Sequence, residues 1–172
     1  MASDNDILFS EKQQFRQWWI WLLLVCLNAP FVAGVIKQIG WGQPFGDDPM
    51  TNTQLICAAS TVALLTIFIL SIRLETQIKP DGIYVQFYPF HFSYRYYPWN
   101  ALRKSYVRQY SPIGEYGGWG LRLGAFGHGK AFNISGSKGL QLEFTNGERL
   151  LIGTNKPEEL NTVLAGIGQL KQ

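Results

Sequence analysis

Two long apolar runs without a charged residue, Trp18–Ile36 and Leu55–Ile72, dominate the first 72 residues of this sequence. A helix rises about 1.5 Å per residue, so about 20 residues cross the hydrocarbon core of a bilayer, which is roughly 30 Å thick. Each run is close to that length. We therefore predict two transmembrane helices, at about 18–36 and 55–72, within an N-terminal region that covers residues 1–73.

Basic residues indicate how this hairpin is oriented. Lys12, Arg16, Arg73 and Lys79 flank its outer ends, whereas Lys37 is alone in the connecting segment. Positive charge stays on the cytoplasmic side of a membrane, so we expect both termini in the cytoplasm. Acidic residues precede the first run and no small-residue cleavage site follows it, which favours a retained span over a signal peptide. The sequence predicts a multi-pass protein of the cell inner membrane.

A polar residue in the first run, Asn28, predicts a contact inside the hairpin. Residues at equal depth in an antiparallel hairpin with these bounds have numbers that sum to about 89, which places Thr61 opposite Asn28. One interpretation makes Asn28 part of a conduction or substrate path, and the other makes it a packing contact. The spans contain no acidic, basic or histidine residue, so we favour packing.

After Arg73 the apolar residues alternate with polar ones, which is typical of strands. Asp81-Gly82 predicts a tight turn, and Asn146-Gly147 predicts a hairpin. We expect seven strands: one ending near Lys79, then 83–88, 92–97, 102–110, 131–134, 140–144 and 149–153. The pattern predicts a mainly-β domain at 74–172.

A single amphipathic helix is expected to close the chain. Pro157 fits its first turn, with Thr154 or Asn155 as the capping residue. Its apolar residues are spaced as one helical stripe, which predicts a buried face: Leu160, Val163, Leu164 and Ile167. The fold class expected from the residues is a membrane α-hairpin followed by a small bent sheet or partly open barrel with a C-terminal helix.

Four segments of the second half resemble bacterial pleckstrin-homology-like domains: Tyr97–Leu102, Gly117–Arg122, Lys138–Leu142 and Leu150–Leu160. The resemblance covers roughly residues 75–168. It implies a seven-strand split barrel capped by a C-terminal helix, and the basic residues that flank the hairpin place this domain in the cytoplasm. It also implies binding or assembly rather than catalysis, and it brings no catalytic residues.

The residues themselves show no constellation for catalysis, for a cofactor or for a metal. The sequence has no G-x-S-x-G motif, and His91 and His128 have no Cys or His partner at ligand spacing. Gly124–Ala131 comes one residue short of a phosphate-binding loop, because Ala131 replaces the Ser or Thr that binds magnesium. A strand rather than a helix is predicted after it, so we interpret the segment as a loop.

Basic residues are enriched between Arg73 and Lys130, where eight cations meet three acids. The candidates for a membrane or partner surface are Arg95, Arg103, Lys104, Arg108, Trp119, Arg122 and Lys130. The cations are interleaved with tyrosines and fit an anionic leaflet, or equally a solvated strand face. Trp119 is either displayed at a loop tip or packed on the barrel between glycines. Nucleic acid is not expected, because a domain tethered to a bilayer meets acidic lipid first.

Together these patterns predict a membrane-anchored module that associates with itself or recruits a protein partner at the cytoplasmic face. The alternative is a module that senses anionic lipid head groups at the inner leaflet. We expect no enzyme activity, no cofactor and no small-molecule substrate. The expected partners are the lipid bilayer and either a second copy of the chain or another protein.

Overall fold

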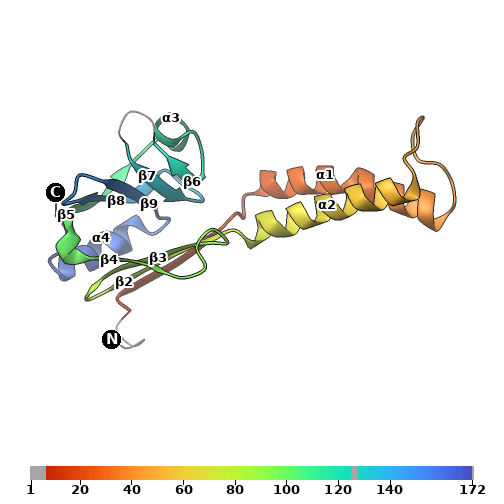
Figure 1. The fold of residues 1–172 in the computed structure, drawn as a ribbon. Coiled ribbons are helices and arrows are strands. Elements are labelled where there is room, and N and C mark those ends of the chain that lie inside the picture. Colours follow the sequence, from red (N-terminus) through yellow and green to blue (C-terminus); the bar gives the residue numbers. More distant parts are fainter. Residues whose placement is uncertain (1–6, 125–127, 172) are drawn as a thin grey trace. The chain divides into compact units, whose positions relative to one another are not determined.

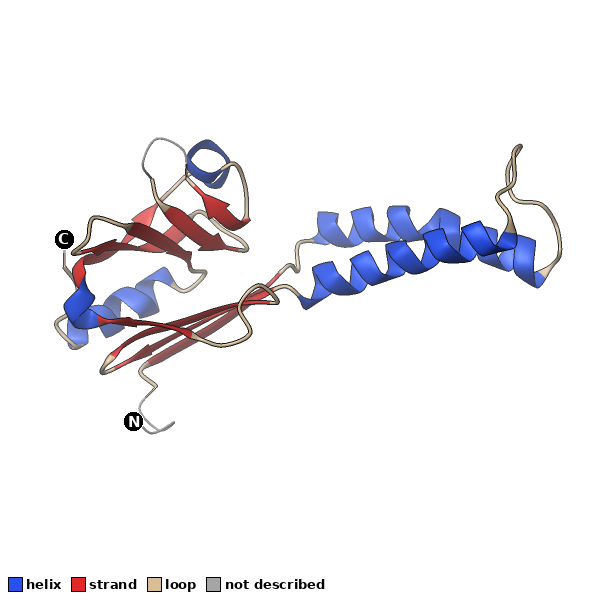
Figure 2. Ribbon diagram, viewed as in Figure 1, coloured by secondary structure: helices blue, strands red, loops and turns tan. Residues whose placement is uncertain are grey.

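The computed structural model describes residues 7–124 and 128–171, which form two compact units (Figures 1 and 2). The helical unit runs from Phe15 to Ser71. The β unit combines the residues up to Gln14 with everything from Ile72 onward. The domain boundary expected at residue 73 is therefore replaced by a helical unit inserted into the β unit, since a strand precedes the first helix.

The helical unit is a pair of long apolar helices. Helix α1 (Trp18–Gly34) continues into a π-helical segment, η2 (Val35–Gly40), and α2 (Asn52–Ser71) follows. Both are long and apolar enough to cross a membrane. The second helix begins before its apolar run because Thr51 and Gln54 form a capping box: each side chain accepts from the backbone N–H of the other.

The polar contact inside the hairpin differs from the expected one. The Asn28 amide donates to Thr66 Oγ1 at 2.8 Å and to the carbonyl of Leu24 at 2.8 Å, whereas the Thr61 hydroxyl donates to the carbonyl of Cys57. The Asn28–Thr61 pairing was wrong because helical side chains lean toward the helix N-terminus. The side-chain amide of Asn28 therefore lies at the depth of Leu24, about one helical turn from the Asn28 Cα, and donates its hydrogen bonds there.

The first sheet of the β unit has four antiparallel strands in the order β1-β2-β3-β4. Their bounds are β1 Phe9–Gln14, β2 Arg73–Lys79, β3 Gly82–Tyr88 and β4 Arg95–Pro98. The predicted alternation in β3 is confirmed, since Ile83, Val85 and Phe87 are buried. Strand β4 begins three residues later than expected, because residues 92–94 belong to the loop before it.

The turn between β2 and β3 consists of Pro80 and Asp81 rather than Asp81-Gly82. Gly82 already pairs with Lys79 and opens β3. A Cβ atom at Gly82 would lie 2.5 Å from the carbonyl oxygen of Tyr97 in β4. Glycine is needed here because the backbone of β4 approaches it closely.

The second sheet has five strands in the order β5-β8-β9-β7-β6, and β7 is parallel to β9. After a short 3₁₀ turn, η3 (Trp99–Ala101), its elements are β5 (Leu102–Gln109), helix α3 (Pro112–Tyr116) and β6 (Gly120–Leu123), followed by β7 (Lys130–Asn133), β8 (Lys138–Phe144) and β9 (Arg149–Gly153). The predicted hairpin at Asn146-Gly147 joins β8 to β9, with a positive φ of 87° at Gly147.

Helix α4 (Pro157–Gly166) contacts β1 of the first sheet and β5 and β8 of the second. Leu160 and Leu164 of its predicted stripe are buried, while Val163 and Ile167 are half-buried. Thr154 and Asn155 are not its cap: the helix N-cap is Lys156, whose N–H donates to Thr154 Oγ1 at 3.0 Å. The predicted C-terminal amphipathic helix is confirmed, without the expected side-chain cap.

Strand β1 was absent from the sequence prediction, and a buried carboxylate ties it to the second sheet. Glu11 accepts from the Thr154 hydroxyl at 2.5 Å and from the backbone N–H of Asn155 at 2.8 Å. The Gln13 amide donates to the carbonyl of Gly153 at 2.7 Å. With β1 and β6 added, the described residues contain nine strands rather than seven.

Candidate functional site

The structure divides the predicted basic surface between the two sheets. Arg95 belongs to β4 of the first sheet. The others lie on the second sheet, in strands β5, β6 and β7: Arg103, Lys104, Arg108, Arg122 and Lys130. They therefore do not form one continuous cationic strip.

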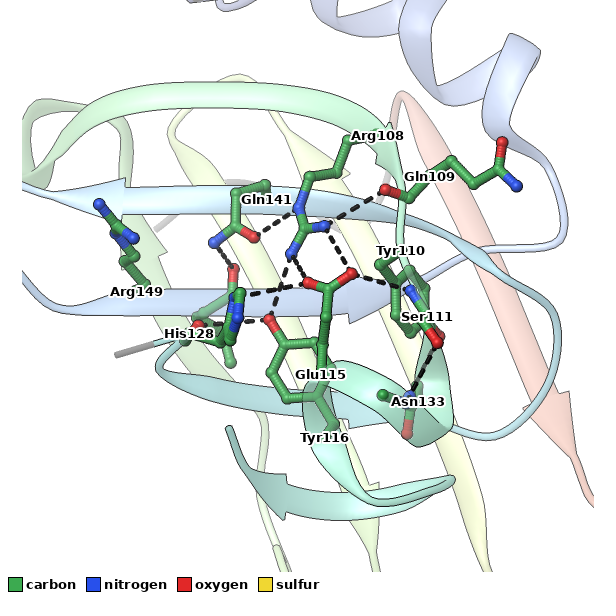
Figure 3. Close-up of polar contacts among 12 residues, drawn as sticks. Arg108, Gln109, Tyr110, Ser111, Glu115, Tyr116, His128, Asn133, Gln141 and Arg149 are labelled. Carbon is green, nitrogen blue, oxygen red and sulfur yellow. Dashed lines mark hydrogen bonds and ion pairs between the residues drawn. The ribbon is translucent and has the colours of Figure 1, made fainter. Parts of the chain in front are cut away.

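Arg108 is the centre of a dense polar network on the second sheet (Figure 3). Its Nε donates to Gln141 Oε1 at 3.0 Å, and its two terminal nitrogens donate to Glu115 at 2.7 and 3.2 Å. Further bonds reach the Tyr116 hydroxyl at 3.4 Å and the carbonyl of Gln109 at 3.2 Å. All three guanidinium nitrogens are thus used inside the protein, which makes Arg108 a poor ligand for an external anion.

Helix α3 brings Glu115 to this network. Ser111 caps the helix by accepting from the N–H of Gly114, and the N–H of Ser111 donates to Glu115 Oε1 at 2.8 Å. The helix ends at Gly117, whose φ of 68° is left-handed. The hydrogen bonds from Arg108 lower the pKa of Glu115, and they outweigh burial, which acts to raise it.

A hollow of about 260 Å³ opens beside the network. It is lined by Tyr106, Arg108, Glu115, His128, Gln141, Glu143 and Arg149. Arg103 donates to Glu143 at 2.9 Å and Arg149 lies 4.0 Å from it. The hydrogen bond from Arg103 lowers the pKa of Glu143. Both carboxylates of this hollow are therefore held in their charged forms by arginines.

This arrangement does not favour acid–base chemistry. A general base works best with a pKa near the working pH, and the pKa values of Glu115 and Glu143 are shifted the other way. His128 Nδ1 lies 3.5 Å from Glu115, but no Ser or Cys is among the described residues that line the hollow. Among the described residues no group of three or more His, Cys, Asp or Glu side chains is placed to hold a metal ion.

Trp119 is half-buried between α3 and β6, and its indole N–H donates to the carbonyl of Gly136 at 3.2 Å. Its own carbonyl accepts from Arg122 Nε at 3.0 Å. Two residues of the predicted surface therefore bond to each other around the glycine-rich segment. This geometry favours the packing interpretation of Trp119.

Strand β6 lies at the edge of the second sheet and pairs only with β7 among the described strands. Two of its apolar side chains are exposed, Leu121 at 41% and Leu123 at 76%. A second hollow, of about 320 Å³, lies beside Leu123 and is also lined by Lys130, Glu148 and Arg149. An apolar edge strand next to a hollow is typical of sites where another chain adds a strand.

The sequence prediction missed the partners of the basic residues. Gln141 and Glu143 were recognised only as the polar positions of β8, and Glu115 and Arg149 were not singled out. The signals were available in part: the β8–β9 hairpin register pairs Glu143 with Arg149, and Ser111-Pro112 predicts a helix start four residues before Glu115. That α3 folds back over β5 was not predictable from spacing.

The segment that resembles a phosphate-binding loop is described in part, because residues 125–127 lie outside the described residues. The glycine-rich stretch leads into β7 at Lys130, so a strand follows it as predicted. No helix begins among the described residues of this segment, so they offer no helix N-terminus to a phosphate.

The sequence matches no protein-family model and no curated protein.

Proposed function

We propose that this protein is a membrane-anchored assembly module of the pleckstrin-homology-like kind, which binds a second copy of itself or another protein at the cytoplasmic face. The edge strand β6, with exposed Leu121 and Leu123, is the observation that carries this proposal. A partner strand added there would hydrogen-bond to the free backbone edge and cover both leucines.

Membrane anchorage is supported by the surface of the helical unit. Only 17% of the apolar window of the first span and 6% of that of α2 is buried. Leu64 and Ile67, for example, are 66% and 62% exposed. Apolar surface on this scale is stable in lipid, whereas in water it would drive aggregation.

The pleckstrin-homology-like assignment is supported by the architecture of the β unit: a four-stranded antiparallel sheet, a second sheet and a C-terminal helix that contacts both. The inner faces of the sheets meet at Phe87 and Phe132, whose rings lie 6.2 Å apart. Two strands exceed the seven-strand plan: β1 extends the first sheet at its edge, and β6 does the same for the second.

The test is Leu123→Lys in the full chain, with Ile113→Lys as the matched control. Ile113 is 69% exposed on α3, so both substitutions place a cation at an exposed apolar position. We expect Leu123→Lys alone to abolish the crosslinked species formed in cells and to lower the mass by light scattering in mild detergent. Equal behaviour of both variants, or a wild-type monomer without a co-purifying partner, would contradict the proposal.

Recognition of anionic head groups has less support. Arg103 and Arg108 are tied to Glu143 and Glu115, so two of the six predicted cations are neutralised within the protein. If head groups were nevertheless the ligand, binding of the purified protein to acidic vesicles would weaken steeply as salt is raised.

A further inference from the structure

The loop between β3 and β4, residues 89–94, displays two exposed apolar side chains, Phe92 and the outer part of Phe90, whose ring lies 5.8 Å from that of Phe87. Phe92 is 86% exposed, more than any other large apolar side chain among the described residues, and Phe90 is 53% exposed. Phenylalanine has no polar atom to solvate, so this exposure is unfavourable in water. Exposed aromatic side chains on a loop are typical of sites that contact a membrane or another protein.

The loop is held in a defined conformation by His91, which lies between the two phenylalanines and is buried at 6% exposure. Its backbone N–H donates to the carbonyl of Phe87 at 2.8 Å, and its Nδ1 accepts from the N–H of Phe87 at 3.3 Å. Its ring and that of Phe132 form a T-shaped pair, with their centroids 5.2 Å apart. The inward anchor at His91 leaves Phe92 outside, so its exposure is built into the fold.

The register of the first sheet fixes which end carries this loop. Tyr88, the last residue of β3, pairs with Arg73, the first residue of β2, and Arg73 also pairs with Gln14 at the end of β1. Along the chain, Arg73 comes two residues after Ser71, where α2 ends, and Gln14 comes four residues before Trp18, where α1 begins. The loop thus leaves the sheet at the end where the chain connects β1 to α1 and α2 to β2.

Residues that suit a membrane interface flank the loop at its two ends, where Arg73 also forms an ion pair with Glu75 at 3.1 Å. Arg73 lies 4.6 Å from the ring centroid of Tyr88, and the Tyr94 hydroxyl donates to Glu75 at 2.7 Å. Arg95, the first residue after the loop, is exposed. Tyrosines and arginines around an apolar tip match the order of layers at a bilayer surface, where phosphates lie outside the acyl chains.

We propose that Phe90 and Phe92 insert into the interfacial layer of the bilayer and form a second membrane contact of the β unit, in addition to the helices. A short chain connection limits how far this sheet end can lie from a bilayer that the helices cross. The inference rests on the proposed membrane anchorage, but it does not depend on β6 or on any protein partner. The ligand is the lipid surface itself, without a specific head group.

The test places a fluorescent reporter at each of two exposed apolar positions, Phe92 at 86% and Ile113 at 69% exposure. Phe92→Cys and, as the matched control, Ile113→Cys are made in the full chain with Cys26→Ala and Cys57→Ala, and are labelled with a polarity-sensitive dye. The proteins are reconstituted into vesicles of phosphatidylcholine alone or with one quarter phosphatidylglycerol. Lipids that carry a quencher at the upper acyl chain then report which dye enters the bilayer.

We expect a blue shift and strong quenching at position 92 in both kinds of vesicle, and neither effect at position 113. Quenching at position 92 that requires phosphatidylglycerol would overturn apolar insertion in favour of charge attraction. A dye at position 92 that the lipids do not quench would overturn the inference. This holds also where the dye is shielded from water by a second copy of the chain. Resistance to carbonate extraction is measured in parallel, because loss of the protein from the vesicles is a failure of anchorage, not of the loop.

A second variant keeps the test independent of labelling. Phe92→Ser removes the most exposed apolar side chain and leaves His91 and the contact of Phe90 with Phe87 in place, so we expect the β unit to stay folded. In the same vesicles, protease should cut the loop of this variant faster than that of the wild type, whereas in detergent the two rates should converge. Equal rates in vesicles would contradict the insertion.

Discussion

The helical unit and the β unit treat apolar side chains in opposite ways. In the β unit the leucines and isoleucines of both sheets are buried, with the exception of Leu121 and Leu123 in β6. Four of them have no exposed surface: Leu74, Ile78, Leu140 and Leu142. In the helical unit most apolar side chains point outward, and Ile20, Leu24 and Leu55 are the buried large ones. The difference shows that the two units have the composition and surface suited to different solvents.

The two units also treat polar groups differently. The β unit pairs its buried carboxylates: Glu11 with Thr154 and Asn155, and Glu143 with Arg103. Among the bonds the structure describes, the apolar helices of the helical unit share two side-chain hydrogen bonds, from Asn28 to Thr66 along the helices and from Gln38 in η2 to Asn52 at the start of α2. Substitutions in the two units therefore test the comparison directly, from the largest effect to the smallest.

The largest effect is expected from Leu142→Ala in the core of the β unit. Leu142 is fully buried, so we expect a loss of about 2–5 kcal/mol in the free energy of unfolding, from lost burial and a residual cavity. Leu64→Ala in α2, a residue 66% exposed, should change it by less than about 0.5 kcal/mol. Urea unfolding in mild detergent measures both. Similar losses for Leu142→Ala and Leu64→Ala would show that Leu64 is buried in the folded protein, as in the core of a water-soluble protein.

The next effect is expected from Glu11→Ala, which removes the acceptor for the Thr154 hydroxyl and the Asn155 N–H. Hydrogen bonds to a charged group contribute about 1.5–3 kcal/mol, and the buried Thr154 hydroxyl and the part-buried Asn155 N–H both lose their acceptor, so a loss within this range is expected. Ser10→Ala, at the exposed neighbouring position, is the control. A loss no larger than that of the control would show that β1 is not held by this contact.

Asn28→Leu is expected to weaken the hairpin by about 0.6–2 kcal/mol, the range for side-chain hydrogen bonds in membranes. Thr66→Val removes the partner and should have a similar effect, while Thr61→Val should have little. Unfolding in mixed micelles with increasing sodium dodecyl sulfate measures the three variants. A larger loss of stability for Thr61→Val than for Thr66→Val would instead support the pairing of Asn28 with Thr61.

The smallest effect concerns pH. The pKa of Glu115 is lowered from its usual value of 4.5, mainly by the hydrogen bonds from Arg108. The folded state therefore binds this proton less readily, so the stabilisation is complete above pH 4.5 and is lost as the pH falls through the lowered pKa. Glu115→Gln should flatten the acid limb of stability against pH, and Glu158→Gln, at an exposed position of α4, should not. If Glu115→Gln and the wild type lost stability in the same way as the pH falls, the contact between Arg108 and Glu115 would not stabilise the folded state.

Some parts of the fold could be predicted because their signals are local. The apolar runs, the alternation in β3, the Asn146-Gly147 hairpin and the stripe of α4 each depend on neighbouring residues. Strand β1 carries no such signal, since its inward side chains are Phe9, Glu11 and Gln13, and two of them are polar. Its place in the sheet depends on Thr154 and Gly153, about 140 positions away along the chain.

The candidate site was predictable in the same limited way. Sequence composition located the cations of β5, but the acids that neutralise them come from α3 and β8. The exposed edge at β6 was not expected, because whether a strand is central or at an edge depends on the strand order of the sheet. Phe92 was assigned to a strand, where its alternation with Ser93 would have turned it to one face.

The amino-acid sequence alone determined the two apolar helices and the change to strand periodicity after Arg73, because hydrophobic length and period are properties of consecutive residues. Only the tertiary structure decided that residues 9–14 join the sheet, that Arg108 is bound to Glu115, and that Phe90 and Phe92 leave the β unit beside Arg73. These features depend on contacts between distant segments, whose free energy exists only once the backbone has brought them together.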